Sequence, residues 1–444
     1  MSISIKPLSG FLELSPGAQK EFDRIKHIIE ETFQRFGFTA LDTPVIERSE
    51  VLLAKGGGEA DKQIYFVNNG ITETAKNELA MRFDLTVPLA RYVASRQEQL
   101  AFPFKRSHVG KVYRGERAQK GRFREFYQCD IDVIGKNSLS VYYDAEIPSV
   151  MYHIFRAINI GPFKIKLSNR KLYGGLMDSH GIQVETAQIL RIIDKAEKVS
   201  RDVIVADFTA LGLTDAQIQG VLAFMDIKGT VAQVLAQLEG LGIVDPQFQE
   251  GLQELTTVTQ TMAQLGVEAD YFEIDLGIVR GLDYYTGMVY ETILTNSPIV
   301  GSICSGGRYE DLASQYSKEK LPGVGMSIGL SRLFWQLQEF GLVGDVSNNT
   351  VAQVLVMPDK EDHLPRAIEL ANFLRAGGVN TDLLLEPMPI KKKFAYVDKL
   401  NTPYTVVVKT LADGQEVTSL QYKEADQIVK KTASFDEILE TIRG

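Results

Sequence analysis

The chain has 444 residues, more than one hydrophobic core normally serves, so we expect two or three domains. Hydrophobic residues make up 44% of it and charged residues 24%, and no apolar run approaches the roughly 20 residues of a membrane helix. The start MSISIKPLSGF lacks the charged and apolar regions of a signal peptide. These features predict a cytoplasmic protein with no membrane segment.

The net charge of −9 argues against general polyanion binding, although a local basic patch would still permit a nucleic-acid partner. Cys129 and Cys304 lie far apart in apolar strand contexts, which suits a reducing compartment. No CxxC or HxxxH pair suggests a structural zinc site.

The first part of the chain begins with apolar positions at helical spacing over residues 18–36. Pro44 then interrupts a short strand, which indicates an edge or an interface. In LAMRFDLTVPLARYVA a strand should end near Phe83 and a helix begin around Thr86, capped by Asp84 or by Thr86 itself. Taken alone, these two side chains need do nothing beyond capping.

The stretch Lys105–Gly135 predicts two strands joined by a polar loop, with eight basic residues between Lys105 and Arg124 against the single carboxylate of Glu116. Period-two alternation in the second strand separates an apolar face from a polar one. The apolar face carries Glu125, Tyr127, Cys129, Ile131 and Val133, and the polar face carries Arg124, Phe126, Gln128, Asp130 and Asp132. The polar face has no packing rationale and suits a small polar ligand, with Arg114 pointing into the same concavity. A solvated hairpin is the alternative.

The remaining segments alternate between buried and chemically rich sequence. A buried helix is expected over residues 143–158, and residues 163–267 read as a strand followed by an inserted helical module. The run 280–287 is dense in polar and aromatic groups, which are costly in a core without partners. Further along, a glycine-punctuated strand should lead into a helix with Arg332 near its start.

The C-terminal part begins with a linker over residues 341–350, followed by strands and helices in alternation that predict a small mixed sheet covered by helices. Lys391, Lys392 and Lys393 open one of these helices. Such a run is usually a solvated face, but it could equally rest on a phosphate backbone.

Five segments together resemble the histidyl-tRNA synthetases, and the resemblance covers nearly the whole chain. They are RFDLTVPLARYVA, YRGERAQKGRFREFYQCDIDVIG, VRGLDYYTG, SGGRYEDL and GVGMSIGLSRL, in this order. The resemblance implies an α+β fold: a class II antiparallel-sheet catalytic core with a helical insertion, a C-terminal α/β anticodon-binding domain, and a homodimer with Pro44 at its interface. The implied boundaries are 1–162 and 268–340 for the core, 163–267 for the insertion, 341–350 for the linker and 351–444 for the anticodon-binding domain.

The resemblance also implies which residues activate L-histidine with ATP. Arg114 and Arg280 match arginines that grip the α-phosphate from opposite sides, and always-charged planar guanidiniums suit that task. Phe126 and Arg332 match a pair that sandwiches the adenine, and Glu116 a residue that contacts the adenine or its metal. Mg²⁺ is expected to arrive with ATP, without a protein cage.

The histidine pocket implied by the resemblance supplies acceptors for an ammonium group and partners for an imidazole. Asp84, Thr86 and Gln128 match the α-amino binders. Asp132 and Tyr285 match the imidazole readers, and Tyr284 and Tyr309 line the pocket. A site that hydrogen-bonds its substrate rejects analogues lacking the group by about 10⁴ or more.

The transfer RNA partner would be tRNA(His), which carries an extra 5′ guanosine. The loop positions Arg117, Gln119 and Arg124 match those that recognise its acceptor end in bacterial members. Anticodon reading would fall to residues 351–444, where single-stranded bases are accessible.

Three departures from the family pattern concern the pocket rather than the family: Ser331, Ser305 and the pair Glu310-Asp311. The main alternative function is a non-catalytic paralogue that senses histidine as a regulatory subunit of ATP phosphoribosyltransferase. Such chains generally lack the C-terminal domain and several motif residues. VRGLDYYTG disfavours another class II synthetase, and the length excludes a sensor fused to a kinase.

Overall fold

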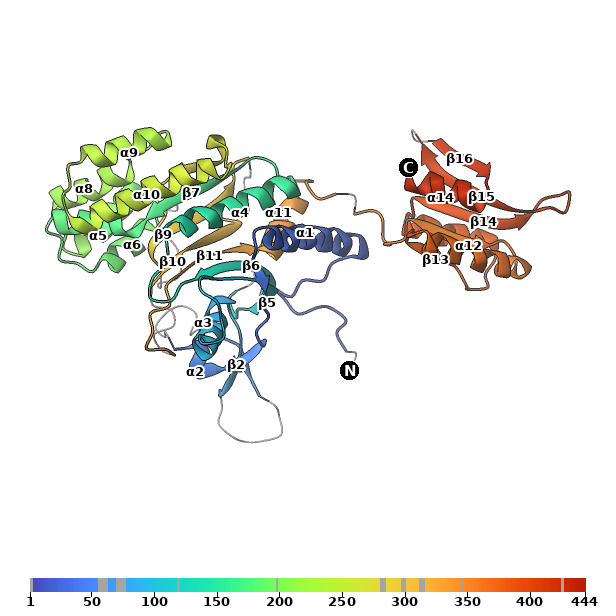
Figure 1. Ribbon diagram of the computed structural model, residues 1–444, viewed down its shortest axis with the longest axis horizontal. Coiled ribbons are helices and arrows are strands. Elements are labelled where there is room, and N and C mark those ends of the chain that lie inside the picture. The colour runs from blue at the N-terminus through green and yellow to red at the C-terminus, as the bar shows by residue number, and fades with distance from the viewer. Residues whose placement is uncertain are drawn as a thin grey trace. The chain divides into compact units, whose positions relative to one another are not determined.

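The computed structural model describes most of the chain (Figure 1). The described residues are 3–54, 63–68, 77–117, 120–196, 199–279, 285–296, 301–310, 316–344, 346–424 and 427–444. Contacts divide the chain into two compact units. The first comprises Met1–Leu12 with Ile25–Leu342, and the second comprises Glu13–Arg24 with Val343–Gly444.

The first unit is built on an eight-stranded sheet in the order β1-β5-β6-β11-β10-β9-β7-β8. Its strands are β1 (Thr39–Ala40), β5 (Phe104–Tyr113), β6 (Glu125–Ile134), β7 (Phe163–Asn169), β8 (Phe272–Ile274), β9 (Tyr285–Leu294), β10 (Cys304–Tyr309) and β11 (Gly323–Gly329). The six strands from β5 to β7 pair antiparallel, and only the short edge strands β1 and β8 pair parallel. The predicted antiparallel core is therefore confirmed.

The hairpin β5–β6 has the period-two alternation that the sequence predicted. Cys129, Ile131 and Val133 are fully buried on the apolar face. The register across the hairpin places Arg106 opposite Asp132 and His108 opposite Asp130. Cross-strand neighbours of this kind lie close enough for their side chains to meet, so the polar face has a set of internal partners.

Helices and a small sheet support the large sheet. They include the part of α1 (Pro16–Arg35) from Ile25 on, α2 (Ser49–Leu52), α3 (Thr86–Arg96), α4 (Tyr142–Ile158) and α11 (Leu330–Glu339). The small sheet has the order β2-β4-β3, with β2 (Ile46–Arg48), β4 (Leu79–Met81) and β3 (Phe66–Val67). Helix α11 packs on β6 and β11, and α4 packs on the same two strands. These contacts fix the β6–β11 pair that carries much of the polar face.

Helices α5–α10 gather beside β7 and β9 (Figure 1). They are α5 (Arg170–Ser179), α6 (Thr186–Ile193), α7 (Arg201–Ala210), α8 (Asp215–Met225), α9 (Val231–Gly240) and α10 (Pro246–Gln264), followed by the 3₁₀ turn η2 (Ala269–Tyr271). Capping boxes at Thr214 and Thr230 begin α8 and α9. The boundaries implied by the family resemblance put strand 163–169 within the inserted module. It is instead hydrogen-bonded to β9 and β8 as part of the large sheet.

The second unit has a five-stranded sheet in the order β13-β12-β14-β15-β16. Its elements are β12 (Val354–Pro358), η3 (Glu361–His363), α12 (Leu364–Ala376), β13 (Thr381–Leu383), α13 (Ile390–Leu400), β14 (Tyr404–Thr410), β15 (Glu416–Glu424), β16 (Gln427–Thr432) and α14 (Phe435–Arg443). Alternate residues of β12 enter two cores, one with α12 and α14 and one with α13. The predicted α/β arrangement is confirmed, and the β15–β16 hairpin and α14 complete it.

Candidate functional site

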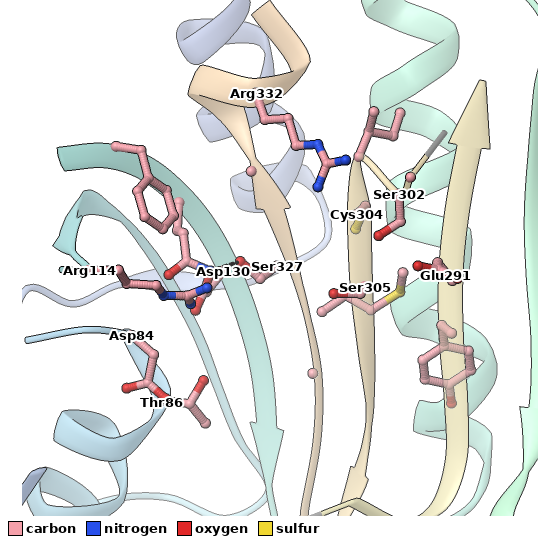
Figure 2. A pocket seen from close by; sticks show the side chains of 18 of the residues that line it. Asp84, Thr86, Arg114, Asp130, Glu291, Ser302, Cys304, Ser305, Ser327 and Arg332 are labelled. Atoms are coloured by element: carbon pink, nitrogen blue, oxygen red, sulfur yellow. Dashed lines mark hydrogen bonds between the residues drawn. The ribbon is translucent and has the colours of Figure 1, made fainter. Parts of the chain in front are cut away.

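A cavity of about 490 Å³ opens in the first unit where the polar face of β6 meets β11, β10 and β9 (Figure 2). All the described residues that were assigned to histidine or ATP from the sequence lie along it. These are Asp84, Thr86, Arg114, Glu116, Phe126, Gln128, Asp132, Tyr285, Tyr309 and Arg332. Residues more than 200 positions apart in the sequence therefore line one space.

A buried ion pair lies at one side of the cavity. Arg106 is fully buried, and its Nη1 donates to Asp132 Oδ2 over 2.8 Å. The Tyr309 hydroxyl donates to Asp132 Oδ1 over 3.1 Å. Burial raises the pKa of Asp132, and Arg106 and the Tyr309 hydroxyl act in the opposite direction. Asp132 is thus a rigid acceptor held from two sides.

Arg106 also determines the tautomer and the charge of His108, which lies behind this pair. Its Nη2 lies 3.0 Å from His108 Nδ1 and donates to the Leu85 carbonyl over 2.8 Å. Because a guanidinium only donates, His108 Nδ1 must accept, which leaves the proton on Nε2, 2.7 Å from Asp42 Oδ1. Burial, Arg106 and Arg82 lower the pKa of His108 to about 3. The imidazole is therefore neutral at physiological pH.

Asp84 lies at the start of helix α3. The N-cap position of α3 is Leu85, so neither Asp84 nor Thr86 occupies it. Asp84 Oδ1 nevertheless accepts a hydrogen bond from the Val87 amide over 3.1 Å, as a capping side chain would. Its Oδ2 is buried and has no hydrogen-bond partner within the described part of the chain. Burial raises the pKa of Asp84 to about 6. A cationic ligand would satisfy the remaining oxygen.

Gln128, Ser327 and Asp130 form a polar row along the β6–β11 pair, where Ser327 is the register partner of Asp130. Gln128 Nε2 donates to the Ser327 hydroxyl oxygen over 2.7 Å. Burial raises the pKa of Asp130 to about 7, and a hydrogen bond with Ser327 acts in the opposite direction. Gln128 Oε1 and Asp130 Oδ1 are buried and find no partner among the residues that the structure describes.

Two arginines enter the cavity from different elements, Arg114 from the end of β5 and Arg332 from the first turn of α11 (Figure 2). The guanidinium of Arg114 stacks over the Phe126 ring, 5.2 Å from its centroid, and its Nε donates to the Phe83 carbonyl over 3.0 Å. Two cations on one cavity, next to an aromatic ring, can receive a polyanion that carries a planar base.

Close backbone approach at β11 gives the cavity its floor. A Cβ at Gly325 would lie 2.3 Å from Asp132 Oδ1 and 2.6 Å from the Ile131 carbonyl oxygen. A Cβ at Gly323 would lie 2.4 Å from the Tyr309 ring. Glycine at these positions lets Asp132 and Tyr309 meet.

The loop between β5 and β6 carries the residues that were matched to the acceptor end of tRNA. Arg124 Nε donates to the Glu116 carbonyl over 3.0 Å, and Arg122 pairs with the Glu116 carboxylate over 3.4 Å. Arg117 and Arg124 do not line the cavity, and Arg117 is exposed. Gln119, Arg280 and Tyr284 lie outside the described residues.

Several lining residues were given no role from the sequence: Asp130, Glu291, Ser302, Ile303, Cys304 and Ser327. Asp130 was placed on the correct face by alternation, whereas Ser327 is recognisable only from the β6–β11 register. The departure Ser331 is buried, and its hydroxyl accepts from the Tyr127 amide over 3.0 Å, which ties α11 to β6. Ser305 lines the cavity, Glu310 lies 3.5 Å from Arg308, and Asp311 lies outside the described residues.

The described residues lack both a metal-binding cluster and a membrane-spanning helix. In the described ranges no group of three or more His, Cys, Asp or Glu side chains is placed to hold a metal ion. Among the described helices, none combines the length and the apolar character needed to cross a membrane.

The buried Lys393 donates to the Pro358 carbonyl over 2.7 Å, so the basic run 391–393 is not a uniformly solvated face.

Comparison with known proteins gives concordant matches. The family profile described as histidyl-tRNA synthetase matches residues 10–333, and the profile described as anticodon binding domain matches residues 353–444. The histidine–tRNA ligase of Clostridium tetani is 47% identical over 443 residues, which cover 99% of each chain.

Two solved structures are also similar. The histidyl-tRNA synthetase of Nostoc sp. PCC 7120 superposes with a TM-score of 0.89 at 36% identity, covering 100% of this chain and 99% of that one. A Bacillus halodurans protein, described as an ATP phosphoribosyltransferase regulatory subunit/histidyl-tRNA synthetase, has a TM-score of 0.74 at 22% identity, covering 89% and 97%. The second likeness concerns the fold alone.

Proposed function

Since this chain belongs to the histidyl-tRNA synthetase family and is a histidine–tRNA ligase, we propose that its cavity binds histidine beside ATP and joins them as histidyl-adenylate. One observation carries this proposal. Arg114 and Arg332 line the same cavity as the buried acceptors Asp84, Gln128 and Asp132. The two arginines suit the phosphates of ATP, and the acceptors suit the positively charged ammonium group of an amino acid.

Histidine would place its ammonium group against Asp84, Thr86 and Gln128. The buried oxygens Asp84 Oδ2 and Gln128 Oε1, which have no partner within the described ranges, support this assignment. A protonated amine satisfies such acceptors and lowers the pKa of the Asp84 carboxyl below its value of about 6 in the empty cavity.

The imidazole would be read by Asp132 and Tyr285, with Tyr284 and Tyr309 lining the pocket. Asp132 suits this role because Arg106 and Tyr309 fix its carboxylate in position. A preorganised acceptor of this kind discriminates by leaving a buried group unsatisfied when a side chain without a donor enters.

In the chemical step, a carboxylate oxygen of histidine attacks the α-phosphorus of ATP. The new oxygen–phosphorus bond forms as the α–β phosphoanhydride bond breaks, and pyrophosphate leaves with the electron pair. Arg114, and Arg280 on the other side, would stabilise the negative charge on the α-phosphate oxygens. Phe126 and Arg332 would hold the adenine. No general base is required because the nucleophile is already an anion.

Mg²⁺ would enter with ATP, and the cavity residues fit that role. Mg²⁺ usually takes one or two protein carboxylates together with phosphate oxygens and water, and Glu116 and Glu291 are carboxylates on the cavity wall. The ion would neutralise phosphate charge when bound.

The second substrate would be tRNA(His), with its acceptor end at Arg117, Gln119 and Arg124 and its anticodon at residues 351–444. The domain assignment that follows is a catalytic core over 1–162 and 268–340, interrupted by the helical module, with 341–350 as linker. Because β7 belongs to the large sheet, we extend the first part of the core from residue 162 to Asn169 and place the start of the module after it. A cytoplasmic homodimer with Pro44 at its interface completes the proposal.

The alternative, a histidine-sensing regulatory subunit, is not favoured. The chain matches an anticodon binding domain profile, and curated histidine–tRNA ligases are 45–47% identical over 91–99% of it.

The test is ATP–pyrophosphate exchange with each amino acid in turn, followed by charging of tRNA(His). We expect exchange with histidine only. Folded protein that gives no exchange with histidine would contradict the activation step. Replacing Arg117 by Ala should impair charging while exchange is retained, and an equal loss in both steps would remove the loop from tRNA binding.

A further inference from the structure

We propose that Asp130 is a positioning residue that acts through Ser327 to set which end of the Gln128 amide faces the substrate. The proposal rests on the proposed function, because it assumes that Gln128 receives the ammonium group of histidine. It assigns a role to Asp130, which alternation placed on the polar face without a role, and to Ser327, which the sequence did not single out.

The geometry supplies a row of three hydrogen-bonding groups on two adjacent strands. Ser327 on β11 is the register partner of Asp130 on β6, and Gln128 lies two residues before Asp130 on the same face. Gln128 Nε2 donates to the Ser327 oxygen over 2.7 Å, and Ser327 favours the charged form of the neighbouring Asp130 carboxyl. Figure 2 shows Asp130 and Ser327 side by side at the cavity.

The chemistry of these groups fixes which of them donates and which accepts along the row, and we call this order the direction of the row. An ionised carboxylate can only accept, so in the proposed row the Ser327 hydroxyl donates its single proton to Asp130. The Ser327 oxygen must then accept from Gln128, and only the amide nitrogen can donate. The amide oxygen is the end that remains for a ligand. Gln128 Oε1 is indeed buried and has no partner among the described residues.

This direction matters because the two ends of an amide have opposite polarity. An oxygen facing the ammonium group accepts a charge-assisted hydrogen bond, whereas an NH₂ group would repel it. Without the anion at Asp130, Ser327 can donate to the Gln128 oxygen instead, which permits the reversed amide. A protonated Asp130 has the same consequence, since a carboxylic acid can donate to Ser327.

The surroundings of Asp130 are mixed in charge. Titratable and charged groups surround it on β5, β6, β10 and the segment before α3, and others lie on the cavity wall. They are Arg106 and His108 on β5, Asp132 and Cys129 on β6, Cys304 on β10, Asp84 before α3, and Arg114 and Glu291 on the cavity wall. Burial and the nearby carboxylates outweigh Arg106, so the pKa of Asp130 rises to about 7. The direction of the row should therefore change with pH near neutrality.

The experiment measures dissociation constants by calorimetry for two ligands, L-histidine and its deamino analogue imidazolepropionate. The variants are Asp130→Asn, Ser327→Ala and the double variant, and Ser327→Thr, which keeps the hydroxyl, is the matched control. At about pH 8.5 each of the first two should weaken histidine binding about 10-fold or more, the cost of a lost charge-assisted hydrogen bond. Imidazolepropionate, which has no ammonium group, should change by less than about threefold.

Two further results follow from the row acting as one unit. The double variant should bind histidine within about threefold of Ser327→Ala alone, because the two changes break the same chain of hydrogen bonds. The ratio of variant to wild-type dissociation constants should fall towards one below about pH 6, and taking a ratio cancels the titration of histidine itself.

Three outcomes would each overturn the positioning role. The losses of histidine affinity could multiply in the double variant, or the ratio of variant to wild-type dissociation constants could be independent of pH. The third outcome is an equal weakening of histidine and imidazolepropionate binding. Ser327→Thr binding histidine as poorly as Ser327→Ala would do the same. If the wild-type protein bound no histidine at all, the proposed function would fail instead, so the two failures are distinguishable. Thermal midpoints of all variants confirm that each protein is folded.

Discussion

Arg106 and Asp132 face each other across the β5–β6 hairpin, and their 2.8 Å ion pair is almost completely shielded from water. Arg106 does not reach the cavity wall, yet it supplies the charge that opposes the burial of Asp132. A buried pair contributes little net stability compared with an apolar pair, but removing one partner leaves an uncompensated charge. Under the proposed function, Arg106 would therefore act on substrate recognition through Asp132.

Replacing Arg106 by Met should raise the pKa of Asp132 further, because the cation that favours the carboxylate is lost. We expect the KM for histidine in pyrophosphate exchange to rise at least about 10-fold at neutral pH, with kcat less affected. The unfolding free energy in urea should fall by about 3–5 kcal/mol.

The matched control is Arg106→Lys, which keeps the charge but loses the fork that also contacts Leu85 and His108. Its KM should lie between those of the wild type and Arg106→Met. A Met variant with an unchanged KM for histidine would show that Asp132 needs no counter-charge, or that Asp132 does not bind the substrate.

The sequence predicted the polar face of β6 because alternation depends only on the strand period, and Gln128, Asp130 and Asp132 lie on it. It also predicted Arg332 near the start of a helix. It could not predict the partners of those side chains, because the pairs Arg106–Asp132 and Ser327–Asp130 depend on strand register. Arg124 was predicted on the cavity face but does not line the cavity. Its Nε donates instead to the backbone oxygen of Glu116 near the end of the strand.

Gly325 should tolerate no side chain. An added Cβ would lie 2.6 Å from the Ile131 carbonyl, a backbone atom that cannot move aside, and 2.3 Å from Asp132 Oδ1. Gly325→Ala should therefore lower the thermal midpoint by several degrees and raise the KM for histidine. Gly329→Ala on the same strand is the control for stability, since its Cβ would have no neighbour nearer than 3.8 Å. Equal midpoints for the two variants would contradict this account.

Arg114 should not be replaceable by lysine. The guanidinium stacks on Phe126 and donates to the Phe83 carbonyl, so its orientation is fixed before ATP binds. Lysine keeps one charge but loses the planar fork. We expect Arg114→Lys to lower kcat for pyrophosphate exchange about 10²- to 10³-fold, with a smaller change in ATP affinity. A variant that loses ATP binding and keeps kcat would assign Arg114 to ground-state binding.

Asp130 should reduce the stability of the protein without ligand at high pH. Its pKa is raised to about 7 in the folded state, whereas an unfolded aspartate titrates near its ordinary value of 3.8. Between these values the folded state binds more protons than the unfolded state, so the free energy of unfolding falls as pH rises and then levels off above about pH 7. Each pH unit in that window corresponds to at most about 1.4 kcal/mol.

Asp130→Asn removes this titration, so its thermal midpoint should exceed that of the wild type at pH 8, and the difference should shrink towards pH 5. Asp84 and Asp132 titrate in both proteins, so their contributions largely cancel in the difference. Scanning calorimetry at the two pH values measures it, and an Asn variant less stable at pH 8 than at pH 5, relative to the wild type, would contradict the raised pKa. A gain in stability together with weaker histidine binding would show that the buried anion is retained for recognition at a cost in stability.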